Sequence, residues 1–136
     1  MAQVLVCNSK QDEIDLIQAE IGNKFTLHSM TSWNEEPLEL KGIDAIILDT
    51  NFTEIHGFDF LMEVCDKSVV PVLLITAPDE PLSAIEARRI GAFNYRVKTD
   101  KLYTVLEVAV REMIIASNDL LELKQTILAQ KTRIAE

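Results

Sequence analysis

Short apolar segments alternate with amphipathic ones along most of this sequence. Five apolar runs have the length and the β-branched content of strands, at residues 3–7, 24–30, 44–49, 71–76 and 93–97. Apolar residues recur at helical spacing between them, in residues 11–22, 58–67 and 79–92 and, more weakly, in residues 33–42. A polar loop is predicted for residues 50–57. Residues from 101 onward contain neither glycine nor proline and predict one long helix.

The predicted order is a strand followed by a helix, five times over. This order favours a parallel sheet with helices on both faces, with the two most apolar strands, 44–49 and 71–76, at its centre. Ligands and chemistry collect at the carboxyl ends of the strands in such sheets. Polar side chains fall at those ends in this sequence: Asn8, Ser9, Asp49, Thr76 and Lys98.

The overall composition suits one globular domain with one core, at 136 residues and 48% apolar content. A net charge of −9 repels phosphate backbones and anionic lipids, so neither nucleic acid nor a membrane is an expected partner. No segment is apolar enough to span a bilayer and no secretion signal is recognisable, so we predict a cytoplasmic location. Cys7 and Cys65 are predicted to be reduced, mostly buried thiols.

Asp49 follows an apolar run that predicts a strand buried on both faces, which is an unusual place for a carboxylate. A carboxylate can attack a phosphoryl group and store it as an acyl phosphate, a transfer that depends on positioning and charge neutralisation. Lys98 could neutralise a phosphoryl oxygen, and Thr76 could donate a hydrogen bond to one. The simpler interpretation is a structural Asp49–Lys98 salt bridge, with Thr76 an ordinary turn residue.

These features together resemble the receiver domains of bacterial response regulators, the CheY-like family. The resemblance covers about residues 3–116 and rests on the strand–helix repeat, the acid that ends strand three, Thr76-Ala77 after strand four and Lys98 after strand five. It implies a flavodoxin-like (βα)5 doubly wound parallel sheet with strand order 2-1-3-4-5. We therefore predict a receiver domain over residues 1–116 and a helical extension over residues 117–136.

The resemblance also implies roles for individual residues. Asp49 matches the phosphoacceptor, and Gly57 matches the loop glycine of the family. Thr76 matches the hydroxyl residue that receives a phosphoryl oxygen, and Tyr95 matches the aromatic residue whose rotation reports activation. Asn51 occupies the position that offers its backbone carbonyl to Mg²⁺ in the family.

The chain departs from the family at the end of the first strand. Response regulators usually have two adjacent acids there to hold Mg²⁺, and this chain has Asn8 and Ser9. Hard cations prefer carboxylates, so we expect weak Mg²⁺ binding or none. Asp12 and Glu13 are predicted to point to solvent from the first helix. Thr99 replaces a proline that a cis bond usually precedes, so a trans bond is predicted here, which would place Lys98 differently.

The last helix is about twice as long as the sheet requires. A series of mostly apolar residues recurs along it at alternating steps of four and three, which predicts a heptad seam: Leu102, Leu106, Ala109, Met113, Ala116, Leu120, Leu123, Ile127, the polar Gln130 and Ile134. We predict a parallel coiled-coil homodimer through residues 102–134, with Val105, Val108 and Ile115 packing on the sheet. The sequence stops in mid-heptad, which predicts an output domain beyond it.

The predicted function is that of a phosphorelay receiver without further enzymatic activity. Its partner would be a histidine kinase or phosphotransfer protein, and the signal would pass from Asp49 to the long helix. The alternative is a phosphorylation-independent pseudo-receiver that serves as an interaction and dimerisation module. A haloacid-dehalogenase-type phosphatase is disfavoured because Asn51 stands where those enzymes have a second acid, and a flavodoxin-type FMN site is disfavoured because residues 7–13 lack a phosphate cradle.

Overall fold

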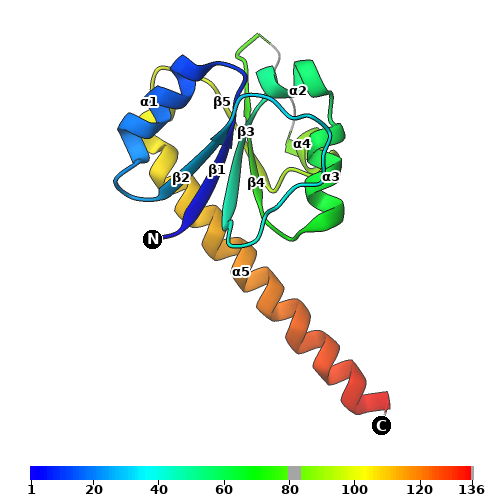
Figure 1. The fold of residues 1–136 in the computed structure, drawn as a ribbon. Coiled ribbons are helices and arrows are strands. Elements are labelled where there is room, and N and C mark those ends of the chain that lie inside the picture. Colours follow the sequence, from blue (N-terminus) through cyan, green and yellow to red (C-terminus); the bar gives the residue numbers. More distant parts are fainter. Residues whose placement is uncertain (80–83, 136) are drawn as a thin grey trace.

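The computed structural model describes residues 1–79 and 84–135 and contains one five-stranded parallel sheet (Figure 1). Its strands are β1 (Gln3–Cys7), β2 (Thr26–Met30), β3 (Ala45–Asp49), β4 (Val72–Thr76) and β5 (Asn94–Val97). Their order is β2-β1-β3-β4-β5, and every neighbouring pair is parallel. The predicted fold class is therefore confirmed, including the strand order and the interior position of the two most apolar strands.

Helices cover both faces of the sheet (Figure 1). One face carries α1 (Gln11–Ile21) and the first half of α5 (Leu102–Ala135). The other face carries α2 (Thr50–His56), α3 (Asp59–Lys67) and α4 (Ala84–Arg89). The predicted helix over residues 79–92 is described only from Ala84, because residues 80–83 lie outside the described part of the chain.

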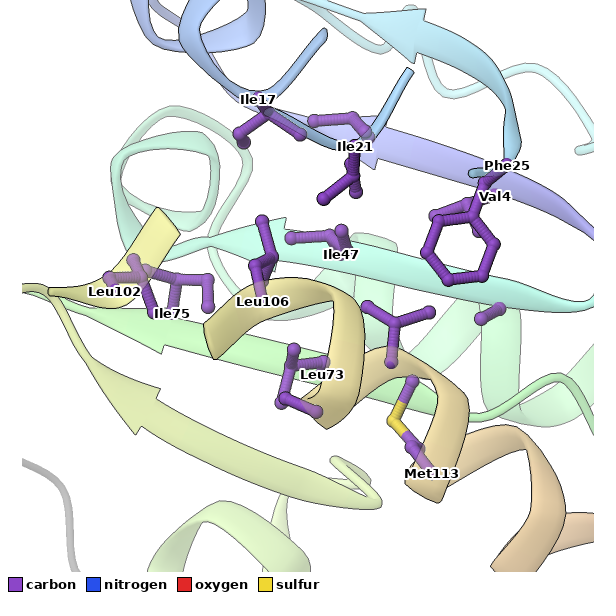
Figure 2. Packing of buried hydrophobic residues seen from close by; sticks show 14 of the residues in the cluster. Val4, Ile17, Ile21, Phe25, Ile47, Leu73, Ile75, Leu102, Leu106 and Met113 are labelled. Carbon is purple, nitrogen blue, oxygen red and sulfur yellow. The ribbon is translucent and has the colours of Figure 1, made fainter. Parts of the chain in front are cut away.

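Alternate strand residues supply the two halves of the core. Val4 and Val6 face α1 and α5, whereas Leu5 and Cys7 face α2, α3 and α4. Every residue of β3 and β4 is buried, as expected for strands covered on both faces. Figure 2 shows the α5 side of this core, where Leu106 and Met113 lie over Leu73 and neighbouring strand residues.

Residues 33–42 do not form the predicted helix, so the second strand–helix unit has no helix. The segment is an irregular loop in which Glu35 has a positive φ of 64°. Pro37 lacks a backbone N–H and disfavours helical geometry for the residue before it, so little sequence is left for a helical turn on either side. Trp33 anchors the loop, with its ring centroid 5.5 Å from that of Phe60.

The predicted polar loop after Asp49 is wrong as well, because residues 50–56 form α2. The Asp49 side chain caps this helix by accepting a hydrogen bond from the backbone N–H of Asn51, at 2.9 Å. Gly57 ends the helix at a φ of +61°, a conformation that favours glycine. Two short helices therefore follow β3 where one was predicted.

The two cysteines differ in environment. Cys7 is buried at the end of β1, as predicted, but Cys65 on α3 is exposed, so the predicted burial is wrong for this residue. Cys65 follows the buried Val64 on α3 and therefore lies on a different side of that helix. Neither cysteine is in a disulfide.

The contacts of α5 correct the prediction for this helix. Its sheet-facing residues are Leu102, Leu106, Ala109, Val110 and Met113. The three residues predicted to pack on the sheet are exposed instead: Val105, Val108 and Ile115. The first half of the predicted dimer seam is thus buried in the chain's own core and cannot meet a second subunit.

Beyond Ser117, α5 leaves the sheet and projects from the body of the domain (Figure 1). Its 34 residues correspond to about 50 Å of helix. Leu120, Leu123 and Ile127 continue the predicted seam and are exposed there. None of the helices within residues 1–79 and 84–135 has the length and apolar character needed to cross a bilayer.

Candidate acid pocket at the strand ends

Most of the predicted site residues meet at one edge of the sheet. Asp49 ends β3, Asn8 follows β1 and Lys98 follows β5, so parallel strands bring them to the same end. Asp49 is 4% exposed and Asn8 is 2% exposed. Lys98 Nζ lies 2.8 Å from Asp49 Oδ2. The described residues contain no cis peptide bond, which agrees with the trans bond predicted before Thr99, and Lys98 reaches the pocket with this backbone.

The Asp49 carboxylate has a hydrogen-bond donor at each oxygen. Oδ1 accepts from the backbone N–H of Asn51, at 2.9 Å. Oδ2 accepts from Lys98, and Asn8 Nδ2 makes a longer contact of 3.4 Å with the same oxygen. The N-terminus of α2 also favours negative charge at this position. The environment therefore stabilises a carboxylate at the end of a strand that is otherwise apolar.

Glu13 belongs to this pocket, which contradicts the prediction that it points to solvent. Its Oε1 forms an ion pair with Lys98 Nζ, and its Oε2 accepts a hydrogen bond from Asn51 Nδ2 at 2.9 Å. The neighbouring Asp12 is exposed, as predicted. Glu13 lies one residue before the buried Ile14 and four before the buried Ile17, so its helical position places it beside the core-facing side of α1.

Asn8 and Ser9 join the start of α1 to α2. Asn8 Oδ1 accepts hydrogen bonds from the backbone N–H of Lys10, at 2.9 Å, and from Asn51 Nδ2, at 2.7 Å. The Ser9 backbone N–H donates to Asn51 Oδ1, at 2.9 Å. The two residues that replace the family's acids therefore serve a hydrogen-bond network centred on Asn51.

Lys98 is the cation of the pocket. Burial alone would lower the pKa of Lys98, but hydrogen bonds to Asp49 and Glu13, together with attraction to both carboxylates, raise this pKa above its ordinary value. Its side chain is 26% exposed and approaches the pocket from the solvent side. The ammonium group therefore stays charged and is shared between two acids.

Thr76 and Tyr95 lie at the same edge but on a different face from Asp49. Thr76 accepts the Lys98 backbone N–H through its carbonyl, at 2.8 Å. Strand alternation points the Thr76 side chain to the face of Leu74, and Tyr95 pairs with Leu74 and packs on that same face. Thr76 is fully buried, and its Oγ1 has no hydrogen-bond partner among the described residues.

Comparison with known proteins supports the class that this fold and pocket define. No family model matches the chain. The response regulator SaeR of Staphylococcus epidermidis is 26% identical over 124 residues, which cover 89% of this chain and 51% of SaeR. The regulatory protein VanRc of Enterococcus gallinarum is 34% identical over 74 residues, covering 54% of this chain and 31% of that protein. The chain thus spans about half the length of SaeR.

Solved structures agree with this assignment of fold. A response regulator receiver domain from Clostridium thermocellum has a TM-score of 0.72 at 22% identity, and the match covers 88% of this chain and 99% of that one. The N-terminal domain of the nisin resistance regulator NsrR has a TM-score of 0.73 at 15% identity, covering 84% and 98%. The predicted resemblance is confirmed: in sequence and fold, this chain is similar to the receiver domains of response regulators.

Receiver domains usually hold Mg²⁺ at the acidic site, so the oxygen donors of this pocket are informative. Hard cations need oxygens with free lone pairs that point at the ion. Here the Asp49 and Glu13 carboxylates converge on an ammonium group, and the Asn8 carbonyl oxygen already accepts two hydrogen bonds. Within the described residues, no cluster of three or more His, Cys, Asp or Glu side chains is placed to hold a metal. These residues do not fit the family's ion.

Proposed function

We propose that this chain is the receiver module of a two-component phosphorelay and that Asp49 accepts the phosphoryl group. The observation that carries the proposal is a carboxylate only 4% exposed, at the carboxyl edge of a parallel sheet, with the Lys98 ammonium 2.8 Å from one oxygen. The sequence similarity to SaeR over most of the chain supports the same role. The donor would be a phosphohistidine of a kinase or phosphotransfer protein.

The chemistry is a transfer between two nucleophiles. An Asp49 oxygen attacks phosphorus, the phosphorus–nitrogen bond of the phosphohistidine breaks, and the imidazole leaves with the electron pair and takes up a proton. Lys98 neutralises charge on the phosphoryl oxygens, which is the main contribution a protein makes to such a transfer. The Thr76 hydroxyl, which has no partner within residues 1–79 and 84–135, can then donate a hydrogen bond to a phosphoryl oxygen.

The same residues suggest how a signal would leave the pocket. Movement of Thr76 toward the phosphoryl group would vacate space beside Tyr95, which packs on the same face of the sheet. Lys98 lies four residues before the start of α5, and a small space in the core is lined by Asp49, Lys98 and Leu106 among others. A change at Asp49 would therefore alter the packing of α5.

The end of α5 supports the second part of the proposal, a homodimer. Leu120, Leu123 and Ile127 form an apolar stripe with no sheet beneath it, and such a helix gains stability by pairing. The proposed coiled coil begins after residue 117, not at residue 102, and α5 crosses the predicted domain boundary without a break. The same proposal includes a cytoplasmic location and an output domain joined to α5. The output domain is supported by the length of SaeR, because this chain matches only about half of that protein.

Light scattering tests the homodimer with two matched variants. Leu123→Lys places a charge on the seam and should give a monomer. Leu128→Lys is the control, because Leu128 is equally exposed but lies about 100° further round the helix from Ile127, and it should stay dimeric. A wild-type monomer would exclude the coiled coil.

The phosphoacceptor is tested with acetyl phosphate and intact-protein mass. Wild type should gain one phosphoryl group, Asp49→Asn should gain none, and Asp59→Asn, which removes an exposed acid from the start of α3, should behave as wild type. The alternative is a pseudo-receiver, and the internally paired pocket around Asn8 and Ser9 favours it. Wild type without an adduct, in a folded dimer, would establish the alternative.

A further inference from the structure

We infer that Glu13 is a positioning residue that holds Lys98 and Asn51 in place, so that the acid pocket keeps its shape without a divalent cation. The inference concerns the resting pocket and holds whether or not Asp49 is phosphorylated. It arises because the oxygen atoms of this pocket do not fit the Mg²⁺ ion that receiver domains usually hold. The contacts of one side chain from α1 carry it.

Glu13 links three elements through its two oxygens. Oε1 pairs with Lys98, which follows β5, and Oε2 accepts from the side chain of Asn51 on α2. Asp49 makes the same two connections, to Lys98 through Oδ2 and to the Asn51 backbone through Oδ1. All four carboxylate oxygens therefore have protein donors, and one ammonium group is shared by both acids.

This arrangement differs from an ordinary surface ion pair. The side chains of Glu13 and Asp49 are 13% and 6% exposed, so solvent screens their attraction to Lys98 weakly. The pair between Arg111 and Glu107 on α5 is far more exposed, and such pairs contribute little. A buried carboxylate without a partner is costly, so the Lys98 ammonium stabilises both acids at once.

The uncharged side chains of Asn8 and Ser9 also limit the negative charge of the pocket. With carboxylates in those places, the pocket would hold more negative charge than one ammonium can balance, and a divalent ion would be needed. With amide and hydroxyl groups there, the pocket holds two carboxylates, Asp49 and Glu13, against one ammonium, so its formal charge is −1 and not −3. A divalent ion would have to displace Lys98 and also take oxygens that now accept hydrogen bonds from Asn51 and Asn8.

The first test compares Glu13→Gln with Asp12→Asn in the full 136-residue chain. Both changes remove one negative charge, and the two positions are adjacent on α1, but Asp12 is exposed. In nitrogen-15 spectra, Glu13→Gln should shift the Asn51 side-chain amide and speed the hydrogen exchange of the Lys98 ammonium, whereas Asp12→Asn should change neither. Equal spectra for the two variants would overturn the inference.

A double-mutant cycle with Lys98→Met measures the coupling between Glu13 and Lys98 in the equilibrium constant of unfolding. The unfolding constants should show about tenfold coupling between Glu13 and Lys98, as expected for groups in contact, and less than about twofold between Asp12 and Lys98. Equal coupling in the two cycles would show that the effect is one of general charge, and would overturn the proposed contact.

The metal test uses wild type and no phosphodonor, so its result is independent of the proposed phosphorylation. Millimolar MgCl₂ or a chelator should leave the melting temperature and the Asn51 and Lys98 amide signals unchanged. A specific Mg²⁺-induced rise in melting temperature that Glu13→Gln abolishes and Asp12→Asn keeps would overturn the inference, because Glu13 would then be a metal ligand.

Discussion

Thr76→Val should stabilise the folded chain, although it changes a residue at the proposed site. Thr76 is completely buried at the end of β4, and its hydroxyl has no partner among the described residues. Valine has nearly the same shape and the same branching at Cβ, so packing around the strand end is kept. The substitution removes a polar group that loses its water on folding and gains no hydrogen bond from the described residues in return.

The size of the effect follows from that desolvation. Leaving a buried hydroxyl unpaired costs about 1 to 3 kcal/mol, and the valine variant recovers this amount in the free energy of unfolding. For a domain of this length, each kcal/mol corresponds to a rise of about 3 to 5 °C in melting temperature. Urea denaturation should show a higher midpoint with an unchanged slope.

Thr53 provides a matched control for this prediction. It is also buried, but its hydroxyl donates to the Thr50 carbonyl oxygen at 2.8 Å. Thr53→Val should therefore destabilise the chain by roughly 1 kcal/mol, opposite in sign to Thr76→Val. If both variants lose stability to the same extent, the Thr76 hydroxyl has a partner in the folded chain and the reasoning is refuted. Under the proposed function, a phosphodonor should change the intrinsic fluorescence of wild type. Thr76→Val should lose this change, because valine has no hydroxyl to donate to the phosphoryl group.

Three further predictions concern the core, the thiols and pH. Leu106→Ala should lower the free energy of unfolding by about 2 to 5 kcal/mol, and Val105→Ala should lower it by less than about 0.5 kcal/mol, because only Leu106 is buried. The opposite order of the two losses would show that the other side of α5 packs on the sheet. Burial raises the pKa of Cys7, so a disulfide reagent should modify the exposed Cys65 in the native protein and reach Cys7 only after unfolding; fast modification of both would contradict the buried position. The folded pKa of Lys98 is raised, so its charge stabilises the fold fully below the unfolded value of about 10.4 and loses this effect as pH rises through the folded value. The difference in free energy of unfolding between wild type and Lys98→Met should therefore decrease as pH rises through the folded pKa of Lys98. A difference that does not change with pH would argue against the ion pairs.

The strands could be predicted because each is a continuous apolar run, and burial on both faces requires such runs in a parallel sheet. The two errors around the sheet have local causes. Residues 33–42 show weak helical periodicity, but Pro37 and the positive φ of Glu35 outweigh it. The helix at residues 50–56 begins after a capping aspartate, and an aspartate in this position is a start signal that the sequence contains.

The pocket was only partly predictable for a different reason. Asp49 and Lys98 follow strands, and topology alone places strand ends together. Glu13 lies on a helix, where its contact depends on the rotation of α1 about its own axis, and a one-residue difference separates it from the exposed Asp12. The position of Glu13 four residues before the buried Ile17 was the available signal. The position of Thr76 could be predicted from the sequence, but whether its hydroxyl finds a partner depends on the folded chain, and none of the residues that the structure describes provides one.

The register of α5 connects the pocket to the exposed end of the chain. Leu102, Leu106 and Met113 face the sheet, and Leu120, Leu123 and Ile127 continue the same series along the helix beyond it. Under the proposed function, a rotation or shift of the first turns of α5 on the sheet would pass along this continuous helix to the exposed stripe. Lys98 stands directly before those first turns and is held by Glu13 and Asp49 together. Under the proposed function, an event that takes Lys98 from one acid toward a phosphoryl group would act at the end of α5 that is packed in the core, and the proposal predicts an effect at the exposed residues Leu120, Leu123 and Ile127.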